Sequence, residues 1–386
     1  METSSGPEIV YLDTNATAPV RPSARAAIAQ AMDRYGNPSS VHRSGRDARA
    51  LVEDAREALA VAVGANPAQV IFTSGATEAN ALALHGLAGI RSILASAVEH
   101  PSVLAHVTAE DHVPVDAAGV INLAALDAAL AVRPGPVLLA VMAANNETGV
   151  IQPLAEVVAI ARRHGALVHC DAVQALGKMP LDMAVLGVDS MALSGHKIGA
   201  AKGIGALVLR PGLEAAAQSV GGGQERRRRA GTENTLGIAA FGAVLREIAD
   251  IVAMAPRIAA LRDHLERDLR TRVPALQLFG ADGPRLPNTL CMALPGVSSE
   301  TQIMALDLAH IAVSAGAACS SGKISPSHVL LAMGVAPDLA GCAIRVSLGW
   351  DTTAEELDRF KAVFEQVARK RAQAGGTPRS LIGSGA

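Results

Sequence analysis

The chain has 386 residues, of which 50% are hydrophobic, 18% charged and only 2% aromatic. This length suggests about two domains, and the large apolar fraction excludes a mostly disordered protein. With 34 basic against 36 acidic residues the net charge is −2, which provides no general electrostatic attraction to nucleic acid or to an anionic membrane.

Short apolar runs alternate with helical patterns between about residues 20 and 250. The first helical pattern covers Ser23–Tyr35, with Ser23 as the expected N-cap, and the second covers Ser44–Val63. Further helices are expected over Asn122–Ala131 and Leu154–His164. This alternation indicates an α/β domain with a largely parallel sheet. Its strand-like runs are Val70–Thr73, Ser92–Ala95, Val137–Ala143, Ala166–Cys170, Ser190–Leu193 and Gly205–Leu209.

The pattern changes after residue 250, where a smaller α+β domain is expected. Thr353 and Glu356 fit the capping box of a last helix that runs to about Arg371, and a mobile Gly/Ser-rich tail follows. Before that helix the sequence predicts an amphipathic helix over Pro256–Val273 and short strands at Thr289–Leu294, Ala312–Ser314 and Ile344–Leu348. The expected division is a large domain of residues 15–254 and a small domain of residues 1–14 and 255–386.

The four cysteines, Cys170, Cys291, Cys319 and Cys342, lie far apart and form no CxxC pair. In a chain of this size they do not suggest a disulfide framework, which favours a reducing, intracellular setting. The N-terminus lacks the basic region and apolar run of a signal peptide. The longest apolar stretch, residues 136–144, is far shorter than the ~20 residues that span a bilayer. We therefore expect a cytoplasmic protein without a membrane segment.

Polar, mostly ionisable residues follow five of the apolar strands at their carboxyl ends. In open α/β sheets this edge is where ligands bind, so five such endings indicate an active site. The endings are Ser74-Gly75-Ala76-Thr77-Glu78, Glu99-His100, Asn145-Asn146-Glu147, Asp171 with Gln174, and Ser194-Gly195-His196-Lys197.

Three of these endings suit parts of one cofactor. The turn at residues 74–77 offers backbone N–H groups, a hydroxyl and a helix dipole to a phosphate, although such a turn is also a common N-cap. Asp171 would be costly to bury without a cation, which a protonated pyridine nitrogen or a structural ion pair would provide. Lys197, in a glycine-rich run, is either a Schiff-base lysine or a solvated surface charge. In combination they favour pyridoxal phosphate, which needs all three.

The sequence motifs also match a known family: the chain resembles the cysteine desulfurases of the NifS/IscS type, within the fold-type-I pyridoxal-phosphate transferases. The resemblance implies a large domain with a mainly parallel seven-stranded sheet beside a smaller α+β domain. The matching segments run in the family's order from residue 11 to 350: YLDTNATAP, GNPSSVHRSG, FTSGATEAN, the Glu99-His100 pair, NNETGVIQP, DAVQALGK, SGHKIGAAKGIGAL, GGGQERRRRAGTEN, SAGAACSSG and IRVSLGW.

The resemblance implies a role for each matching residue. Lys197 would hold pyridoxal 5'-phosphate covalently, and Asp171 would keep its pyridine nitrogen protonated. Gln174 would contact the ring hydroxyl, and His100 would stack on the ring and assist proton transfer. The substrate carboxylate would be held by Asn146 and Arg345. The other implied cofactor residues are Ala76, Thr77, Asn146, Ser194 and His196, together with Thr232 contributed by a second subunit.

The implied reaction converts L-cysteine to L-alanine and transfers the sulfur to the thiolate of Cys319 as a persulfide. The protein would then be a sulfurtransferase and a homodimer. The segment after Cys319 (GKISPSHVLLAMG) resembles the subgroup with a long cysteine loop, which supplies iron–sulfur cluster assembly, so a NifU/IscU-like scaffold protein is the expected sulfur acceptor. A free cysteine is more often a buried small apolar residue, and we interpret the other three cysteines in that way.

Alternative functions remain open at this stage. The arginines Arg226–Arg229 invite a nucleic-acid interpretation, but without neighbouring aromatic residues they support it weakly. The histidines form no zinc pattern, and no metal is expected. Besides a desulfurase, the sequence is compatible with an aminotransferase or lyase of the same fold, in which Cys319 would be dispensable. It is also compatible with a cofactor-binding regulatory or sulfur-carrier protein without turnover.

Overall fold

The computed structural model describes residues 9–316 and 326–375. Cys319 and the tail after residue 375 lie outside the described residues. No helix within the described ranges is long and apolar enough to cross a membrane.

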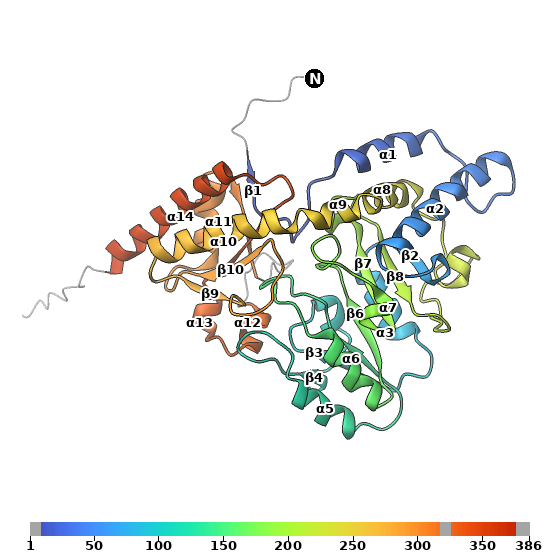
Figure 1. Cartoon of the computed structure of the whole chain (residues 1–386), viewed down its shortest axis with the longest axis horizontal. Coiled ribbons are helices and arrows are strands. Elements are labelled where there is room, and N and C mark those ends of the chain that lie inside the picture. The colour runs from blue at the N-terminus through green and yellow to red at the C-terminus, as the bar shows by residue number, and fades with distance from the viewer. Residues whose placement is uncertain (1–8, 317–325, 376–386) are drawn as a thin grey trace, which may run out of the picture.

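A seven-stranded sheet forms the centre of the larger part of the molecule (Figure 1). The strand order is β2-β8-β7-β6-β5-β3-β4; β8 is antiparallel to both of its neighbours, whereas the other pairs are parallel. This arrangement confirms the mainly parallel α/β fold. The strands are β2 (Val70–Thr73), β3 (Ser92–Ser96), β4 (His112–Val113), β5 (Val137–Ala140), β6 (Leu167–Asp171), β7 (Ser190–Ser194) and β8 (Gly205–Leu209).

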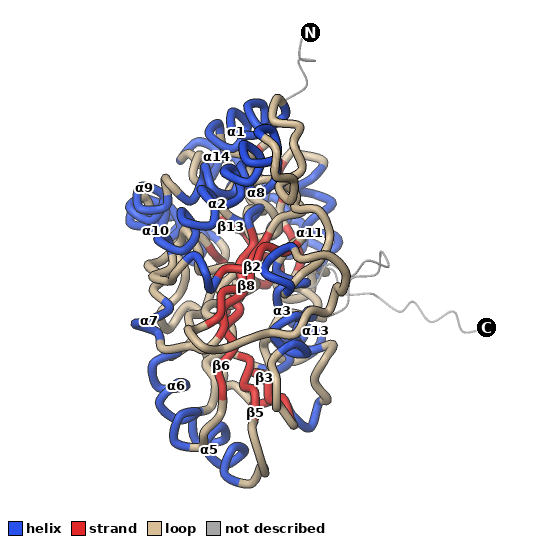
Figure 2. The backbone as a smooth tube through the Cα atoms, turned by 90° about the vertical axis from the view of Figure 1, so that its right-hand side faces the viewer, coloured by secondary structure: helices blue, strands red, loops and turns tan. Residues whose placement is uncertain are grey.

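Helices cover both faces of this sheet, as Figure 2 shows. Successive residues of a strand point to opposite faces, and in β2 the side chain of Phe72 joins one core while that of Ile71 joins another. On the Phe72 side lie α2 (Arg43–Ala62), α5 (Leu123–Ala131), α6 (Leu154–Arg163) and α8 (Thr235–Leu245), and α1 (Pro22–Met32) packs on α8. On the Ile71 side lie α3 (Ala76–Gly86) and α4 (Pro101–Leu104).

The smaller part of the molecule has a four-stranded antiparallel sheet of order β12-β13-β10-β9. The first strand of the described residues, β1, pairs in parallel with β11, which places residues 10 and 11 in this part. The other strands are β1 (Val10–Tyr11), β9 (Gln277–Phe279), β10 (Thr289–Ala293), β11 (Ile311–Ala312), β12 (Ser314–Ala315) and β13 (Ala343–Ser347). The helices are α10 (Ala255–Arg272), α11 (Ser299–Asp307), α12 (His328–Ala332), α13 (Pro337–Ala340) and α14 (Ala354–Gly375).

Most core side chains of the two parts belong to separate clusters. The clusters on the two faces of the seven-stranded sheet belong to the larger part, whereas Val10, Leu12 and side chains between Ile258 and Phe364 form the main core of the smaller part. A further cluster joins Val98 of the larger part to Phe279 and Val329 of the smaller part. In Figure 1, α9 (Ile248–Ala253) and α10 follow one another from the larger to the smaller part. We therefore propose the division at residues 14/15 and 254/255 as a true domain division.

Three local predictions need correction. Ser23 is not the N-cap of α1: the helix begins at Pro22, with Arg21 as N-cap, because proline is suited to the first helical position. Residues 312–314 do not form one strand, since Ala312 belongs to β11 and Ser314 to β12 of another sheet. The last helix continues beyond Arg371, although its predicted capping box is present: Thr353 N donates to Glu356 and Glu356 N to Thr353 Oγ1.

Candidate functional site

The five strand endings come together at the carboxyl edge of the seven-stranded sheet and line one cavity of about 1310 Å³. The smaller part closes the cavity from the other side with Ser314, Ala315, Gly316, His328 and Arg345. Ten of the predicted site residues line it: Ala76, Thr77, His100, Asn146, Asp171, Gln174, Ser194, His196, Lys197 and Arg345.

Two predicted residues are not placed at the cavity. Thr232 is exposed in the loop before α8 and is not among the lining residues, so its contribution from a second subunit stays a prediction. Cys319 lies outside the described residues. Gly316 and His328, on either side of the gap in the described chain, both line the cavity.

Lys197 ends the short 3-10 turn that follows β7, which directs its side chain to the sheet edge. Its Nζ donates to the backbone carbonyls of Asn15 (2.7 Å) and Ala16 (2.9 Å). Burial, and next the positive charge of Arg345, lower the pKa of Lys197 to about 8. A lysine poised in this way supplies a neutral, nucleophilic amine close to neutral pH.

This pKa predicts the pH dependence of the reaction of Lys197 with an aldehyde. Only the deprotonated amine reacts, so below pH 8 the rate rises about tenfold per pH unit and it levels off above the pKa. The measurement is borohydride-trapped labelling of Lys197 in apo-protein by pyridoxal phosphate, followed by mass spectrometry from pH 6 to 10. Arg345→Gln removes a charge that lowers the pKa, so its inflection is expected at higher pH. A wild-type inflection near the ordinary value of 10.5 would contradict the assignment.

Asp171, the last residue of β6, is buried and is held by neutral donors. Its Oδ2 accepts from Asn80 Nδ2 (2.9 Å) and its Oδ1 from Val173 N (3.0 Å). The side-chain oxygen Oδ1 of Asn80 in turn lies 3.0 Å from His169 Nε2. Because an amide oxygen only accepts hydrogen bonds, His169 carries its proton on Nε2. Its Nδ1 then accepts a hydrogen bond from the Ser190 hydroxyl at 2.9 Å. The resulting chain of hydrogen bonds fixes the Asp171 carboxylate from behind.

Glu99 precedes His100 but is fully buried and does not line the cavity. Its Oε1 accepts from Met142 N at 2.6 Å. Burial, and then the nearby charge of Asp171, raise the pKa of Glu99 well above its ordinary value. Both effects favour the protonated form of Glu99.

His100 is the N-cap of α4, and its Nδ1 accepts the backbone N–H of Ser102 at 3.0 Å. The ring therefore carries its proton on Nε2 when it is neutral. Burial lowers the pKa of His100 and outweighs the opposing charge of Asp171, and the nearby Lys197 and His328 lower the pKa further, so the neutral ring is favoured near pH 7. His100 thus offers a neutral imidazole with an Nε2–H donor at the cavity wall.

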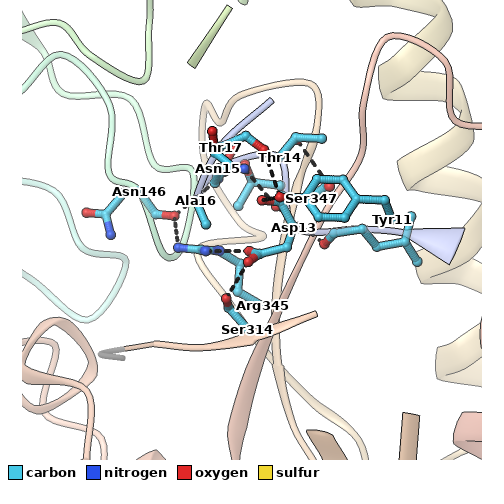
Figure 3. A network of polar contacts seen from close by, with 12 residues as sticks. Tyr11, Asp13, Thr14, Asn15, Ala16, Thr17, Asn146, Ser314, Arg345 and Ser347 are labelled. Carbon is cyan, nitrogen blue, oxygen red and sulfur yellow. Dashed lines mark hydrogen bonds and ion pairs between the residues drawn. The ribbon is translucent and has the colours of Figure 1, made fainter. Parts of the chain in front are cut away.

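Arg345, from the middle of β13, is buried between the two parts of the molecule (Figure 3). It donates from Nη2 to Asp13 Oδ1 (2.7 Å) and from Nη1 to the Asn146 carbonyl (3.1 Å). Ser314 Oγ also donates to this aspartate, at its Oδ2 (2.8 Å). Arg345 Nε is buried and has no partner among the described residues. The guanidinium is thus fixed in orientation and retains an unused donor.

The turn at residues 74–78 opens α3, whose first backbone N–H groups have no helical acceptor. Glu78 closes the turn by accepting from Ser74 N at 2.7 Å. Arg229 holds the turn from outside, donating to Glu78 Oε1 (2.9 Å) and Ser74 Oγ (3.0 Å). Next along the sheet edge, His196 Nδ1 lies 3.1 Å from Thr17 Oγ1, and burial together with the charge of Lys197 lowers the pKa of His196 to about 4.

The arginine cluster 226–229 is anchored within the chain. Arg226 and Arg228 both donate to the Ala68 carbonyl. The loop is held by the buried Glu225, whose carboxylate accepts two hydrogen bonds of 2.8 Å from Arg56. Residues 225–227 adopt positive φ angles of 45°, 56° and 64°, a strained conformation that persists only where the surroundings impose it. These contacts give the cluster a structural role beside the turn at residues 74–78.

The three described cysteines are buried and free. Burial, and then Asp171, raise the pKa of the Cys170 thiol well above its ordinary value, and burial also raises that of Cys291. Cys342 donates its thiol to the Asp338 carbonyl at 3.2 Å. These environments agree with a structural interpretation of all three.

The motifs assign no role to several residues that support the site, although two of them, Asn15 and Asn80, lie within the matching segments YLDTNATAP and FTSGATEAN. The backbone carbonyl of Asn15 accepts a hydrogen bond from Lys197 Nζ. The Asn15 side chain donates from Nδ2 to Thr289 Oγ1 (2.9 Å) and to the Asn146 carbonyl (3.1 Å). Asn80 lies inside a helix, and His169 inside a strand, where buried polar residues usually have only a structural role. Their contribution depends on contacts between distant parts of the chain.

The family model for class-V aminotransferases matches residues 10–360 of the chain. Cysteine desulfurase IscS of Dictyoglomus turgidum is 39% identical over 375 residues, which cover 94% of this chain and 95% of that protein. The solved structure of a NifS-like protein from Rickettsia africae ESF-5 matches with a TM-score of 0.87 at 34% identity, over 94% of this chain and 100% of that one. The structure of SspA in complex with cysteine matches with a TM-score of 0.75 at 28% identity, over 88% and 98% of the two chains.

Proposed function

The chain belongs to the class-V aminotransferase family and, within it, to the cysteine desulfurases, and on this basis we propose that it converts L-cysteine to L-alanine with pyridoxal 5'-phosphate and passes the sulfur to Cys319. The observation that carries the proposal is the convergence of Lys197, Asp171 and Arg345 from separate elements on one cavity. These are an amine, a carboxylate and a guanidinium, the groups that a cofactor aldehyde, a pyridinium and a substrate carboxylate require.

The cavity fits the cofactor by its charges and its unused donors. The buried Asp171 carboxylate accepts hydrogen bonds from an amide and a backbone N–H and would pair with a protonated pyridine nitrogen. The first turn of α3, with Ala76 and Thr77, offers N–H groups to the phosphate, together with Ser194 and His196 across the cavity. When bound, pyridoxal phosphate supplies an electron-accepting ring that stabilises the carbanion left by loss of an α-proton.

Arg345 would bind the substrate carboxylate with the help of Asn146. Its guanidinium is already oriented by Asp13 and by the Asn146 carbonyl, and its Nε has no partner among the described residues. A preoriented fork reduces the entropy lost when a carboxylate binds. SspA was solved with cysteine bound, and L-cysteine is the substrate that we propose for this chain.

Lys197 and His100 would carry out the proton transfers of the reaction. With a pKa of about 8, the Lys197 amine is ready to take the α-proton of the substrate at Nζ. His100, whose neutral form is favoured by burial, would present Nε2–H to the cavity and would cover the cofactor ring in place of a Phe, Tyr or Trp side chain.

Cys319 would accept the sulfur as its thiolate. An S–S bond forms between Cys319 and the substrate sulfur while the Cβ–S bond of the substrate breaks. The electron pair of the broken bond stays with the carbon fragment, which becomes alanine on protonation. Support comes from Gly316 and His328, which line the cavity on either side of the undescribed segment, and from the burial of the other three cysteines.

We also propose that the protein is a homodimer and delivers its sulfur to an iron–sulfur scaffold protein. Tyr35 and Val220 have exposed fractions of 89% and 83%, and a dimer interface over them would remove both side chains from water. Their loops are linked by a hydrogen bond of 3.4 Å from Gln224 to Ser39. Thr232, expected at the partner's phosphate site, lies exposed at the end of the Val220 loop. The cytoplasmic location stays a prediction from the sequence.

The test is an anaerobic assay of the purified protein with pyridoxal phosphate and L-cysteine. We expect alanine and, with a thiol reductant present, an equal amount of sulfide. Consumption of cysteine that requires an added 2-oxo acid would instead identify an aminotransferase. Cofactor binding without loss of cysteine would identify a protein without turnover.

A further inference from the structure

Lys178 is a second lysine next to the candidate active site, and the proposed reaction does not use it. It lies after β6 in the turn that carries Gln174, and Gly177, with a φ of 72°, lets the chain turn back so that the two side chains meet. Lys178 and Lys197 both line a smaller cavity, together with Trp350, and Lys197 also lines the main cavity.

Both contacts of Lys178 are hydrogen bonds to amide oxygens. Its Nζ donates to Gln174 Oε1 at 2.6 Å and to Asn15 Oδ1 at 2.7 Å. Burial, and then the charges of Lys197 and Arg345, lower the pKa of Lys178 well below its ordinary value. Such a lysine is poorly suited to a solvated surface role, and its two short contacts indicate that it holds acceptors in place.

These contacts determine which way the Gln174 amide points. The oxygen and nitrogen of an amide exchange places by a simple rotation of the side chain. Lys178 Nζ needs an acceptor, which assigns Oε1 to its side, and Gln174 Nε2 donates to the Asn15 carbonyl at 3.0 Å. The buried Gln174 lines the main cavity, and its amide nitrogen has a second N–H that these contacts do not use.

Asn15 makes this arrangement rigid. Its side-chain oxygen also accepts from Asn288 Nδ2 at 3.0 Å, and its own amide nitrogen is held by Thr289 and Asn146. The same residue's carbonyl accepts from both Gln174 and Lys197. Lys178 therefore donates to two amides of fixed orientation, one of which reaches the cofactor site.

We propose that Lys178 is a positioning residue that locks the Gln174 amide with its N–H side toward the cavity, so that the site selects a negatively charged oxygen on the cofactor ring. This inference rests on the proposed function, in which Gln174 contacts the ring hydroxyl oxygen. An N–H donor stabilises that oxygen in its ionised form. A flipped amide would place its carbonyl oxygen against the ionised ring oxygen, and the two would repel each other.

The test is a double-mutant cycle with Lys178→Met, Gln174→Ala and the double variant. The dissociation constant of pyridoxal phosphate from apo-protein is measured through the fluorescence of Trp350, the only tryptophan in the chain. Lys178→Met is expected to weaken binding about tenfold in the wild-type background and by less than about twofold in the Gln174→Ala background. Lys178→Arg, which keeps N–H donors, is expected to retain affinity within about threefold.

A spectroscopic readout separates positioning from general damage. In Lys178→Met the pH at which the bound cofactor changes its absorbance is expected to rise. Without a fixed Gln174 N–H donor, the ionised ring oxygen would be more basic, so a higher pH would be needed to remove the proton that it shares. The melting temperature of the apo-protein shows whether each variant is folded. If Lys178→Met does not fold, Lys178→Leu takes its place. Equal weakening in both backgrounds would overturn the inference. Failure of the wild-type apo-protein to bind pyridoxal phosphate would instead overturn the proposed function.

Discussion

Lys197→Ala will lower alanine formation from L-cysteine by about a thousandfold or more, because it removes both the amine that attaches the cofactor and the base that takes the α-proton. The structure gives this amine a buried position, two carbonyl acceptors and a pKa of about 8. The assay measures alanine under saturating cofactor, and borohydride treatment reports covalent attachment. The variant is expected to release its cofactor on gel filtration after this treatment.

Lys197→Arg is the matched control for this prediction. It keeps a positive charge at the cavity but cannot form a carbon–nitrogen double bond with the aldehyde. Like the alanine variant, it is expected to be inactive and unlabelled. Cofactor that remains fixed after borohydride in either variant would mean that another amine attaches it.

Cys319→Ser is the second change with a large expected effect. A serine hydroxyl does not accept the substrate sulfur, so alanine formation is expected to fall by at least about a hundredfold. Cofactor binding depends on other residues, so the dissociation constant and absorbance of bound pyridoxal phosphate are expected to remain those of the wild type. Kinetics of alanine release and a cofactor titration provide the two measurements.

Cys342→Ser is the control for this substitution. Cys342 is buried away from the cavity, and a serine can keep its hydrogen bond to the Asp338 carbonyl. Its activity is expected to stay within about twofold of the wild type. Undiminished alanine formation in the Cys319 variant would favour the aminotransferase or lyase alternative.

The architecture was largely predictable because most strands of the seven-stranded sheet, including its edge strand β2, are buried on both faces. β2 and β8 have the expected bounds, Val70–Thr73 and Gly205–Leu209, since strands covered on both faces are continuous apolar runs. The parallel strands also explain the site, because their carboxyl ends meet at one edge and bring their polar endings to one cavity.

Predictions failed where the outcome depends on neighbours that local sequence does not reveal. Ser23 is an excellent N-cap residue, yet Pro22 starts the helix and leaves Ser23 Oγ buried without a partner among the described residues. Residues 312–314 are apolar enough for one strand, but the chain passes from one sheet to another between them.

The supporting residues of the site could not be predicted for the same reason. Asn80 meets Asp171, 91 residues away, and Asn15 meets Thr289, 274 residues away. Their function follows from hydrogen bonds that exist only once these distant segments of the chain are folded together. Motifs therefore identified the groups that would touch the cofactor, whereas only the structure indicates the residues that hold those groups in place.

Mass spectrometry of Cys319 after an anaerobic reaction tests the central claim most directly. The wild-type protein, loaded with pyridoxal phosphate and treated with one equivalent of L-cysteine, is alkylated and digested. We expect one additional sulfur atom on the peptide that contains Cys319, in an amount equal to the alanine formed. Alanine formed in full with no added sulfur on that peptide, or the added sulfur on another cysteine, would contradict it.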